Sequence, residues 1–277
     1  MRYGFVLPDM DIATAPELAA EAEQAGWDAV FLPDCISIET PDFPAGPACD
    51  PWIALAAMAL RTSRVLLGPM VAAVPRRRPW KLAREVATLD HLSRGRMLLP
   101  VGVGAAADDA GFREVGEEMG LRERAERMGE ALEILDGLWR GEPFSYQGRH
   151  FQIGRMTQLP PPVQRPRVPI WVVGVWPAPK SINRALEWDG IIPQKKGGPL
   201  TPDDVRALRT QADAMRGSVP FDIVVEGSTP GDKPADAARQ VQPWMQAGAT
   251  WWMESMWFEH TTSSVRERIR QGPPAAG

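Results

Sequence analysis

The stretch MLLPVGVGAAAD, residues 97–108, decides between two fold classes. Its apolar run ends in Gly102-Val103-Gly104 and Ala107 follows, which spells G-x-G-x-x-A, a form of the dinucleotide-binding fingerprint. A Rossmann unit would place a helix directly after the glycines and a second strand soon after that helix. Here residues 108–120 are loop-like, a long helix follows, and the next apolar strand begins only at Pro169. We therefore reject the fingerprint and predict that the glycines end a strand of another α/β fold.

The rest of the chain supports this choice, because apolar strand-like runs alternate with helical patterns throughout. The eight predicted strands are Tyr3–Leu7, Asp28–Leu32, Val65–Val71, Arg96–Val101, Pro169–Val173, Asp189–Pro193, Phe221–Glu226 and Ala249–Glu254. Helical segments between them begin at residues such as Pro51, Pro79 and Pro202, the last after the capping residue Thr201. Eight such units in about 250 residues fit a closed (β/α)8 TIM barrel.

The predicted barrel is a single domain over residues 1–277. We expect a small hairpin insertion after the fourth helix, formed by Phe144–Phe151 and turning at Gln147-Gly148. The proline-rich connector Leu159–Pro166 leaves a two-domain division as the alternative.

Composition excludes several function classes. The chain is 44% hydrophobic with a formal charge of -4, so it lacks the basic excess of a nucleic-acid binder. The one basic cluster, Arg76-Arg77-Arg78, is predicted as a solvated loop or helix start. Cys35 and Cys49 form neither a disulfide framework nor a metal-site spacing, which indicates a reducing, cytoplasmic setting. No apolar run is long enough to span a membrane, so we expect no membrane partner. Because no metal-site spacing of Cys and His occurs, we also expect no bound metal.

A barrel active site forms at the C-terminal ends of the strands, and few acid-base groups lie there in this sequence. The candidates for catalytic groups are Asp34 and Cys35 after the second strand and Glu254 at the end of the eighth. Each also has a structural interpretation: a cap or salt bridge for the carboxylates, and a small buried side chain for Cys35. Further polar or aromatic strand-end positions are Gln194, Lys195, Glu226 and Trp257.

The predicted strand ends carry mainly apolar and aromatic side chains. The tryptophans near them are Trp171, Trp176, Trp251, Trp252 and Trp257. Core packing explains some of these, and the others could line a pocket for a flat aromatic ligand. Gly102 and Gly104 either let a ligand lie against the backbone or only permit a tight turn. A site of this kind suits a reaction whose chemistry resides in a bound cofactor.

Several segments, taken together, resemble the bacterial luciferase-like, flavin-dependent oxidoreductase family. The similarity runs from the first strand to about Pro193, with one segment near the C-terminal end. The segments are Ala22–Asp28, Cys49–Leu55, Arg61–Gly68, Ala87–Arg96, Val101–Gly104, Ala131–Pro143, Gln147–Phe151, Pro162–Trp171 and Ala247–Trp251.

The resemblance implies a TIM barrel that binds FMN or the deazaflavin coenzyme F-420. Such a protein is an oxidoreductase: a monooxygenase that uses reduced flavin on a small organic substrate, or an enzyme that transfers hydride with F-420. It further implies a separate flavin reductase as partner and a homodimer, formed through the second and third helices.

The resemblance also implies which residues contact the cofactor. The ring would lie against a bulge in the third strand at Met70-Val71, often with a non-prolyl cis peptide, whereas a cis Gly68-Pro69 bond is a competing possibility. The phosphate end would lie near the fourth and fifth strand ends, close to an arginine of the following helix. The matching residues are Gly102, Gly104, Gly174, Trp176 and Arg124, with Arg122 as substitute. The alternative to phosphate binding by Arg124 is a salt bridge on the protein surface.

Three departures from the family pattern motivate other hypotheses. Cys35 stands where relatives often carry a histidine, Ala105–Ala107 replaces a polar loop, and Trp176 could close the phosphate space. A repurposed barrel with a blocked phosphate site would bind a hydrophobic metabolite or a partner subunit. A hydrolase or lyase that uses Asp34 and Glu254 is the third hypothesis.

Overall fold

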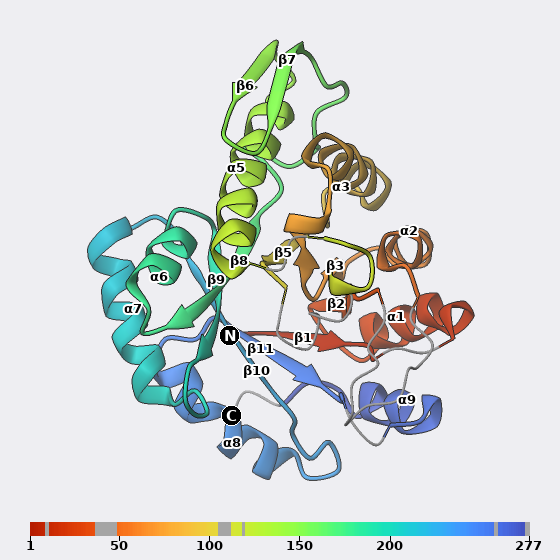
Figure 1. The fold of residues 1–277 in the computed structure, drawn as a ribbon. Helices are drawn as coiled ribbons and strands as arrows, with labels where there is room; N and C mark the ends of the chain where they lie inside the picture. Colours follow the sequence, from red (N-terminus) through yellow and green to blue (C-terminus); the bar gives the residue numbers. More distant parts are fainter. Residues whose placement is uncertain (9–10, 37–48, 105–111, 118–119, 258–259, 275–277) are drawn as a thin grey trace.

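Strands and helices alternate along the chain in the computed structural model of the protein (Figure 1). The structure describes residues 1–8, 11–36, 49–104, 112–117, 120–257 and 260–274. The elements are β1 (Arg2–Val6), η1 (Ile12–Thr14), α1 (Ala15–Gln24), β2 (Ala29–Leu32), α2 (Pro51–Arg61), β3 (Leu66–Pro69), β4 (Ala72–Ala73), η2 (Val74–Arg76), α3 (Pro79–Ser93), β5 (Leu99–Gly102), α5 (Leu121–Trp139), β6 (Phe144–Gln147), β7 (Gln152–Met156), β8 (Ile170–Trp176), α6 (Pro179–Leu186), β9 (Gly190–Lys195), α7 (Pro202–Arg216), β10 (Asp222–Gly227), α8 (Pro234–Gln246), β11 (Trp251–Ser255) and α9 (Thr262–Arg270). Across these ranges, no helix has both the length and the apolar character that a bilayer crossing needs.

The main sheet is a closed ring of parallel strands. Its order is β3-β2-β1-β11-β10-β9-β8-β5-β4, and β3 and β4 are the two halves of the third barrel strand. The ring closes where the Leu67 amide donates to the Arg96 carbonyl at 2.9 Å and the Leu98 amide donates to the Leu67 carbonyl at 2.8 Å. The prediction of a (β/α)8 TIM barrel is confirmed.

The third barrel strand is interrupted, which the sequence pattern did not predict. The expected single strand Val65–Val71 is instead β3 and β4, and Met70 and Val71 form a bulge between them. The Met70-Val71 peptide is cis, as the family resemblance implied, so the competing interpretation of a cis Gly68-Pro69 bond is wrong. The Met70 amide donates to the Leu32 carbonyl at 2.6 Å, which fixes the bulge against the end of β2.

Large side chains fill the barrel interior. Trp171 and Trp251 pack edge to face with ring centroids 5.1 Å apart, and Phe31 lies 6.0 Å from Trp171. Gly4 leaves room for Met253, because a Cβ on Gly4 would lie 2.4 Å from the Met253 sulfur. Trp171 and Trp251 are each 1% exposed, so they are core residues and do not line a pocket at the mouth. Core packing, one of the two interpretations that the sequence left open, therefore applies to these two tryptophans.

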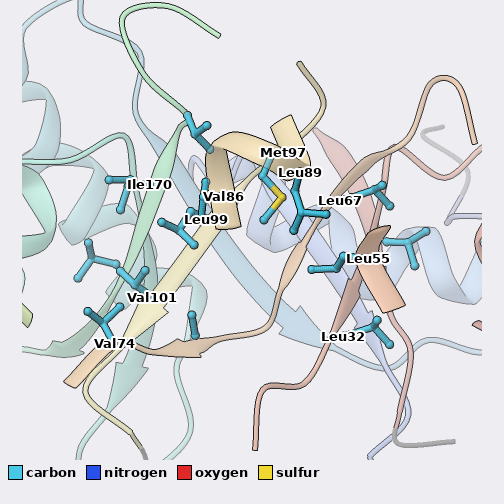
Figure 2. Packing of buried hydrophobic residues seen from close by; sticks show 14 of the residues in the cluster. Leu32, Leu55, Leu67, Val74, Val86, Leu89, Met97, Leu99, Val101 and Ile170 are labelled. Carbon is cyan, nitrogen blue, oxygen red and sulfur yellow. The ribbon is translucent and has the colours of Figure 1, made fainter. Parts of the chain in front are cut away.

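A second apolar layer lies between the outer face of the sheet and the helices. Figure 2 shows part of it, where Leu55 of α2 and Val86 and Leu89 of α3 pack over strand residues such as Leu67 and Leu99. Trp252 belongs to this outer layer, so it too does not line the mouth. The helices that cover the sheet begin as their sequences predict. Pro51, Pro79 and Pro202 each open a helix, and Thr201 caps α7 by accepting from the Asp204 amide.

The hairpin is longer than its sequence indicated. It was predicted over Phe144–Phe151 with a turn at Gln147-Gly148, but its second strand, β7, begins only at Gln152. The carboxylate of Glu130 on α5 accepts hydrogen bonds from the amides of Arg149, His150 and Phe151 at 2.8–3.2 Å. This contact from a distant helix holds a wider loop than the turn signal alone suggests. The hairpin projects beyond the end of α5 (Figure 1).

Candidate active site

At the C-terminal opening of the barrel, called the mouth here, one side is an apolar surface that we call the floor. It is formed by Val71 in the bulge, Gly102 at the end of β5 and Val173 of β8. A Cβ on Gly102 would lie 3.2 Å from Val71 Cγ2 and 3.4 Å from Val173 Cγ2. The missing side chain therefore lets Val71 and Val173, which are both partly exposed, approach each other over the buried Gly102. The two valine side chains thus form an apolar surface with Gly102 between them.

Gly104 is glycine for a different reason. Its φ is +85°, a left-handed conformation that side chains rarely adopt, and a Cβ there would lie 2.5 Å from Phe112 Cε2. Gly104 makes a tight turn, and the approach of a ligand to Gly102 stays a prediction.

Arg124 lies at the edge of this floor. It extends from the first turns of α5, it is 1% exposed, and its guanidinium stacks 4.5 Å from the centre of the Phe112 ring. Its Nη1 lies 3.2 Å from the position a Cβ would take on Gly104. Arg122, the substitute, has a side chain that is 90% exposed and pairs with Glu126 at 3.0 Å. Arg124 rather than Arg122 therefore places positive charge beside the end of β5.

The basic cluster lies in η2 and at the N-cap of α3, as the helix-start interpretation predicts, but Arg76 and Arg77 are packed into the structure, so a solvated loop is wrong for these two residues. The Arg76 side chain is 5% exposed and that of Arg77 is 19% exposed. Both reach the end of β2, where Arg77 Nη2 lies 2.8 Å from both carboxylate oxygens of Asp34. Arg76 Nη2 donates to the Asp34 carbonyl at 2.6 Å, and its guanidinium lies 5.4 Å from the Phe112 ring centre. Arg76 and Arg124 thus contact the same aromatic ring.

Asp34, the candidate acid or base of the second strand, is 7% exposed and its carboxylate is held by these two arginines. A carboxylate in a bidentate ion pair orients its partner. The contacts favour a positioning role for Asp34 over proton transfer. Cys35, the next residue, is partly exposed.

Glu254 lies on the opposite face of its strand from the mouth. Trp252 packs in the outer layer and Met253 packs in the interior, so the alternation of β11 directs Glu254 outward. Its carboxylate is fully buried and accepts from the Thr229 amide at 2.7 Å, from Trp252 Nε1 at 3.0 Å and from Arg268 Nε at 3.2 Å. These contacts tie α9 to the sheet, and none of them involves a residue of the floor.

A family model for luciferase-like monooxygenases matches residues 3–273 of the sequence. The chain belongs to the luciferase-like monooxygenase family. The interrupted third strand, the apolar floor and the buried arginine therefore lie in a luciferase-like barrel.

Characterised relatives of this luciferase-like chain use two cofactors. The F-420-dependent glucose-6-phosphate dehydrogenase of Nakamurella multipartita is 32% identical over 177 residues, which cover 64% of this chain and 50% of that protein. The oxygenase component of the flavin-dependent trigonelline monooxygenase of Acinetobacter baylyi is 29% identical over 156 residues, which cover 56% of this chain and 41% of that protein. The matched segments thus span half or less of these two relatives.

The same fold occurs in solved structures. The monooxygenase RslO1 from Streptomyces bottropensis superposes with a TM-score of 0.81 at 19% identity, over 98% of this chain and 97% of that one. This likeness supports the barrel assignment over nearly the full length of the luciferase-like chain.

Gly174 and Trp176 of this luciferase-like barrel lie away from the floor. A Cβ on Gly174 would lie 2.5 Å from Ile191 Cδ1, so this glycine allows close packing on the outer face of the sheet. Trp176 also faces outward, and its Nε1 donates to Asp204 of α7 at 3.1 Å. Trp176 therefore does not cover Gly102, and the blocked-site hypothesis loses this part of its basis. The other part of that hypothesis, Ala105–Ala107, lies outside the described residues.

The residues present suit a flat ring with an anionic tail. The floor presents the partly exposed side chains of Val71 and Val173, and the buried guanidinium of Arg124 lies near its edge, at Gly104. One Arg76 nitrogen, Nη1, is buried and makes no hydrogen bond within the described part of the chain. Sequence reasoning missed Phe112 and Arg76; a lone aromatic residue in a polar loop was the only signal for Phe112. The chemistry of this donor set matches a phosphate-bearing cofactor.

Proposed function

We propose that this protein is a flavin- or deazaflavin-dependent oxidoreductase that acts on a small organic substrate with reduced FMN or coenzyme F-420. One observation carries the proposal: the floor formed by Val71, Gly102 and Val173 ends at the buried cation Arg124. An apolar surface with a guanidinium at its edge is complementary to a ring that carries an anionic side chain.

The bound cofactor would supply the redox chemistry, by hydride transfer or by activation of O2. The side chains of Val71 and Val173 would contact the ring and exclude water from one of its faces. Arg124 would bind the phosphate, and Phe112 would hold the guanidinium in place from its other side. Asp34 would orient Arg76 and Arg77 rather than exchange protons with a substrate.

Of the other candidate groups, we assign Cys35 to the rim of the mouth and Glu254 to the attachment of α9. The hydrolase hypothesis needs Asp34 and Glu254 in one site. That arrangement finds no support, because Glu254 faces the helical layer and Asp34 faces two arginines.

We also propose two protein partners. With FMN as cofactor, a separate reductase would supply the reduced form. A second copy of the chain would pack against α2 and α3, where Ile53 and Leu60 are 68% and 71% exposed and Leu92 is 37% exposed. Light scattering coupled to gel filtration tests the dimer, and Leu60→Glu should shift a dimer toward monomer.

Titration of the purified protein with oxidised and reduced FMN and F-420 tests the function. Saturable binding of at least one form, followed by tryptophan and cofactor fluorescence, is the expected result. Riboflavin is the matched control, since it carries the same ring without the phosphate. Failure of all four cofactor forms to bind would refute the proposal.

A further inference from the structure

The mouth of the barrel has a second, polar side that the proposed cofactor site does not use. It is formed by the ends of β9, β10 and β11. Ile192, Val224 and Met253 point into the barrel interior. Side chains two residues further along each strand lie on the same face, so Gln194, Glu226 and Ser255 also point inward.

Glu226 differs from the residues below it because it is exposed although it faces inward. Val224, two residues earlier, is 1% exposed, so the packed interior ends between these two positions. The Glu226 carboxylate therefore lies at the level where the barrel opens. Its only hydrogen bond within the described ranges comes from Trp257 Nε1, just after β11.

Topology places this carboxylate opposite the floor. In the closed ring, β10 is separated from the interrupted third strand by the same number of strands in both directions. Glu226 therefore stands across the mouth from Met70 and Val71. A substrate lying over a ring on the floor would have its far side toward β10.

No cation neutralises Glu226 among the residues that the structure describes. Other charged groups near the strand ends are paired: Asp34 with Arg77 at 2.8 Å, and Lys195 with Asp204 at 2.7 Å. Trp257 is 39% exposed and holds one carboxylate oxygen, so the second oxygen and part of the indole are available to a ligand. A carboxylate beside an aromatic ring is a pair that binds organic cations.

We propose that Glu226 and Trp257 form a subsite for a positively charged group of the substrate, with quaternary ammonium compounds as the substrate class. The inference rests on the proposed function, since it places the substrate between this pair and a ring on the opposite floor. Glu226 acts as a specificity residue: it attracts and orients the cation, and no bond to it forms or breaks.

Choline and 3,3-dimethylbutan-1-ol, its neutral isostere with carbon in place of nitrogen, test the subsite by calorimetric titration of the full chain. Choline should bind about tenfold more tightly than the isostere, and added salt should weaken only the binding of choline. Glu226→Gln keeps an acceptor for Trp257 and removes the charge, so it should abolish this preference. Glu187→Gln, at the C-terminal end of α6 and the opposite end of the barrel, makes the same change of charge and should leave the preference intact.

Equal affinities for the two probes, undetectable binding of choline, or a Glu226→Gln variant that keeps the preference would each overturn the proposal. The comparison of probes in the unmodified protein does not depend on how any variant folds. Titration of Glu226→Gln with FMN and F-420 reports on the cofactor separately and should give unchanged affinities. A protein that binds choline with the predicted preference but no cofactor would refute the oxidoreductase proposal and leave the cation subsite standing.

Discussion

Substitution of Gly102 by alanine separates cofactor binding from folding. The added methyl group would lie 3.2 Å from Val71 Cγ2 and 3.4 Å from Val173 Cγ2, so the neighbours need to move by only a few tenths of an ångström. Gly102 has no left-handed φ, and alanine is favoured over glycine in a strand by about 0.5–1 kcal/mol. The free energy of unfolding of Gly102→Ala should therefore stay within about 1 kcal/mol of the wild-type value.

The same methyl group presses against Val71 and Val173, whose side chains form the surface on which the ring would lie. A ring lifted from the floor by even 1 Å loses a quarter to a half of its dispersion contacts. We expect the affinity for FMN or F-420 to fall about tenfold to hundredfold, which corresponds to about 1.4–2.8 kcal/mol. Fluorescence titration measures the affinity, and urea unfolding of the same preparations measures the stability.

Gly174→Ala is the matched control. Its methyl group would lie 2.5 Å from Ile191 Cδ1 on the outer face of the sheet, so overpacking should cost about 1–3 kcal/mol of stability and leave cofactor affinity unchanged. A folded Gly102→Ala variant that binds cofactor as tightly as the wild type would refute the assignment of the floor.

Three further predictions, the first with a matched control variant, concern other residues. Arg124→Gln should weaken FMN binding about tenfold or more and leave riboflavin binding nearly unchanged, because only FMN carries the phosphate; Arg122→Gln, at an exposed position, should affect neither in the same titration. Glu254→Gln should lower the free energy of unfolding by about 3 kcal/mol at unchanged cofactor affinity, and loss of turnover at wild-type stability would instead assign catalysis to it. Burial raises the pKa of Asp204, but hydrogen bonds from Lys195 and Thr201 outweigh it and lower the pKa from 3.8 to about 2. The stabilisation is thus present above pH 3.8 and lost as the pH falls toward 2, so acid unfolding curves should show Asp204→Asn less stable at neutral pH and closer to wild type near pH 2.

The order of strands could be predicted because each strand is a short apolar run bounded by turn residues. The face of the sheet on which each side chain lies could not be predicted. Strands of a parallel barrel are apolar on both faces, so Trp251 and Trp252 look equivalent in the sequence although one fills the interior and the other packs under the helices. The same ambiguity put Glu254 forward as a catalytic candidate, whereas Glu226, which points into the mouth, was only one of several strand-end positions.

Ion pairs between residues far apart in the chain were the second feature that could not be predicted from the sequence. Arg76 and Arg77 form a charged run typical of a solvated loop, and their partner Asp34 lies more than 40 residues away. Pairing of β2 with β3, which β4 continues, brings the ends of β2 and β4 together. The bulge at Met70-Val71 was predicted from the family resemblance and not from its own residues.

The central claim is that a flavin-type ring lies on the floor formed by Val71, Gly102 and Val173. A crystal structure of the protein with bound FMN or F-420 tests it most directly. The account predicts the ring against Gly102 and the bulge, with the phosphate at Arg124. A ring bound elsewhere on the protein, or a floor that stays empty at saturating cofactor, would contradict it.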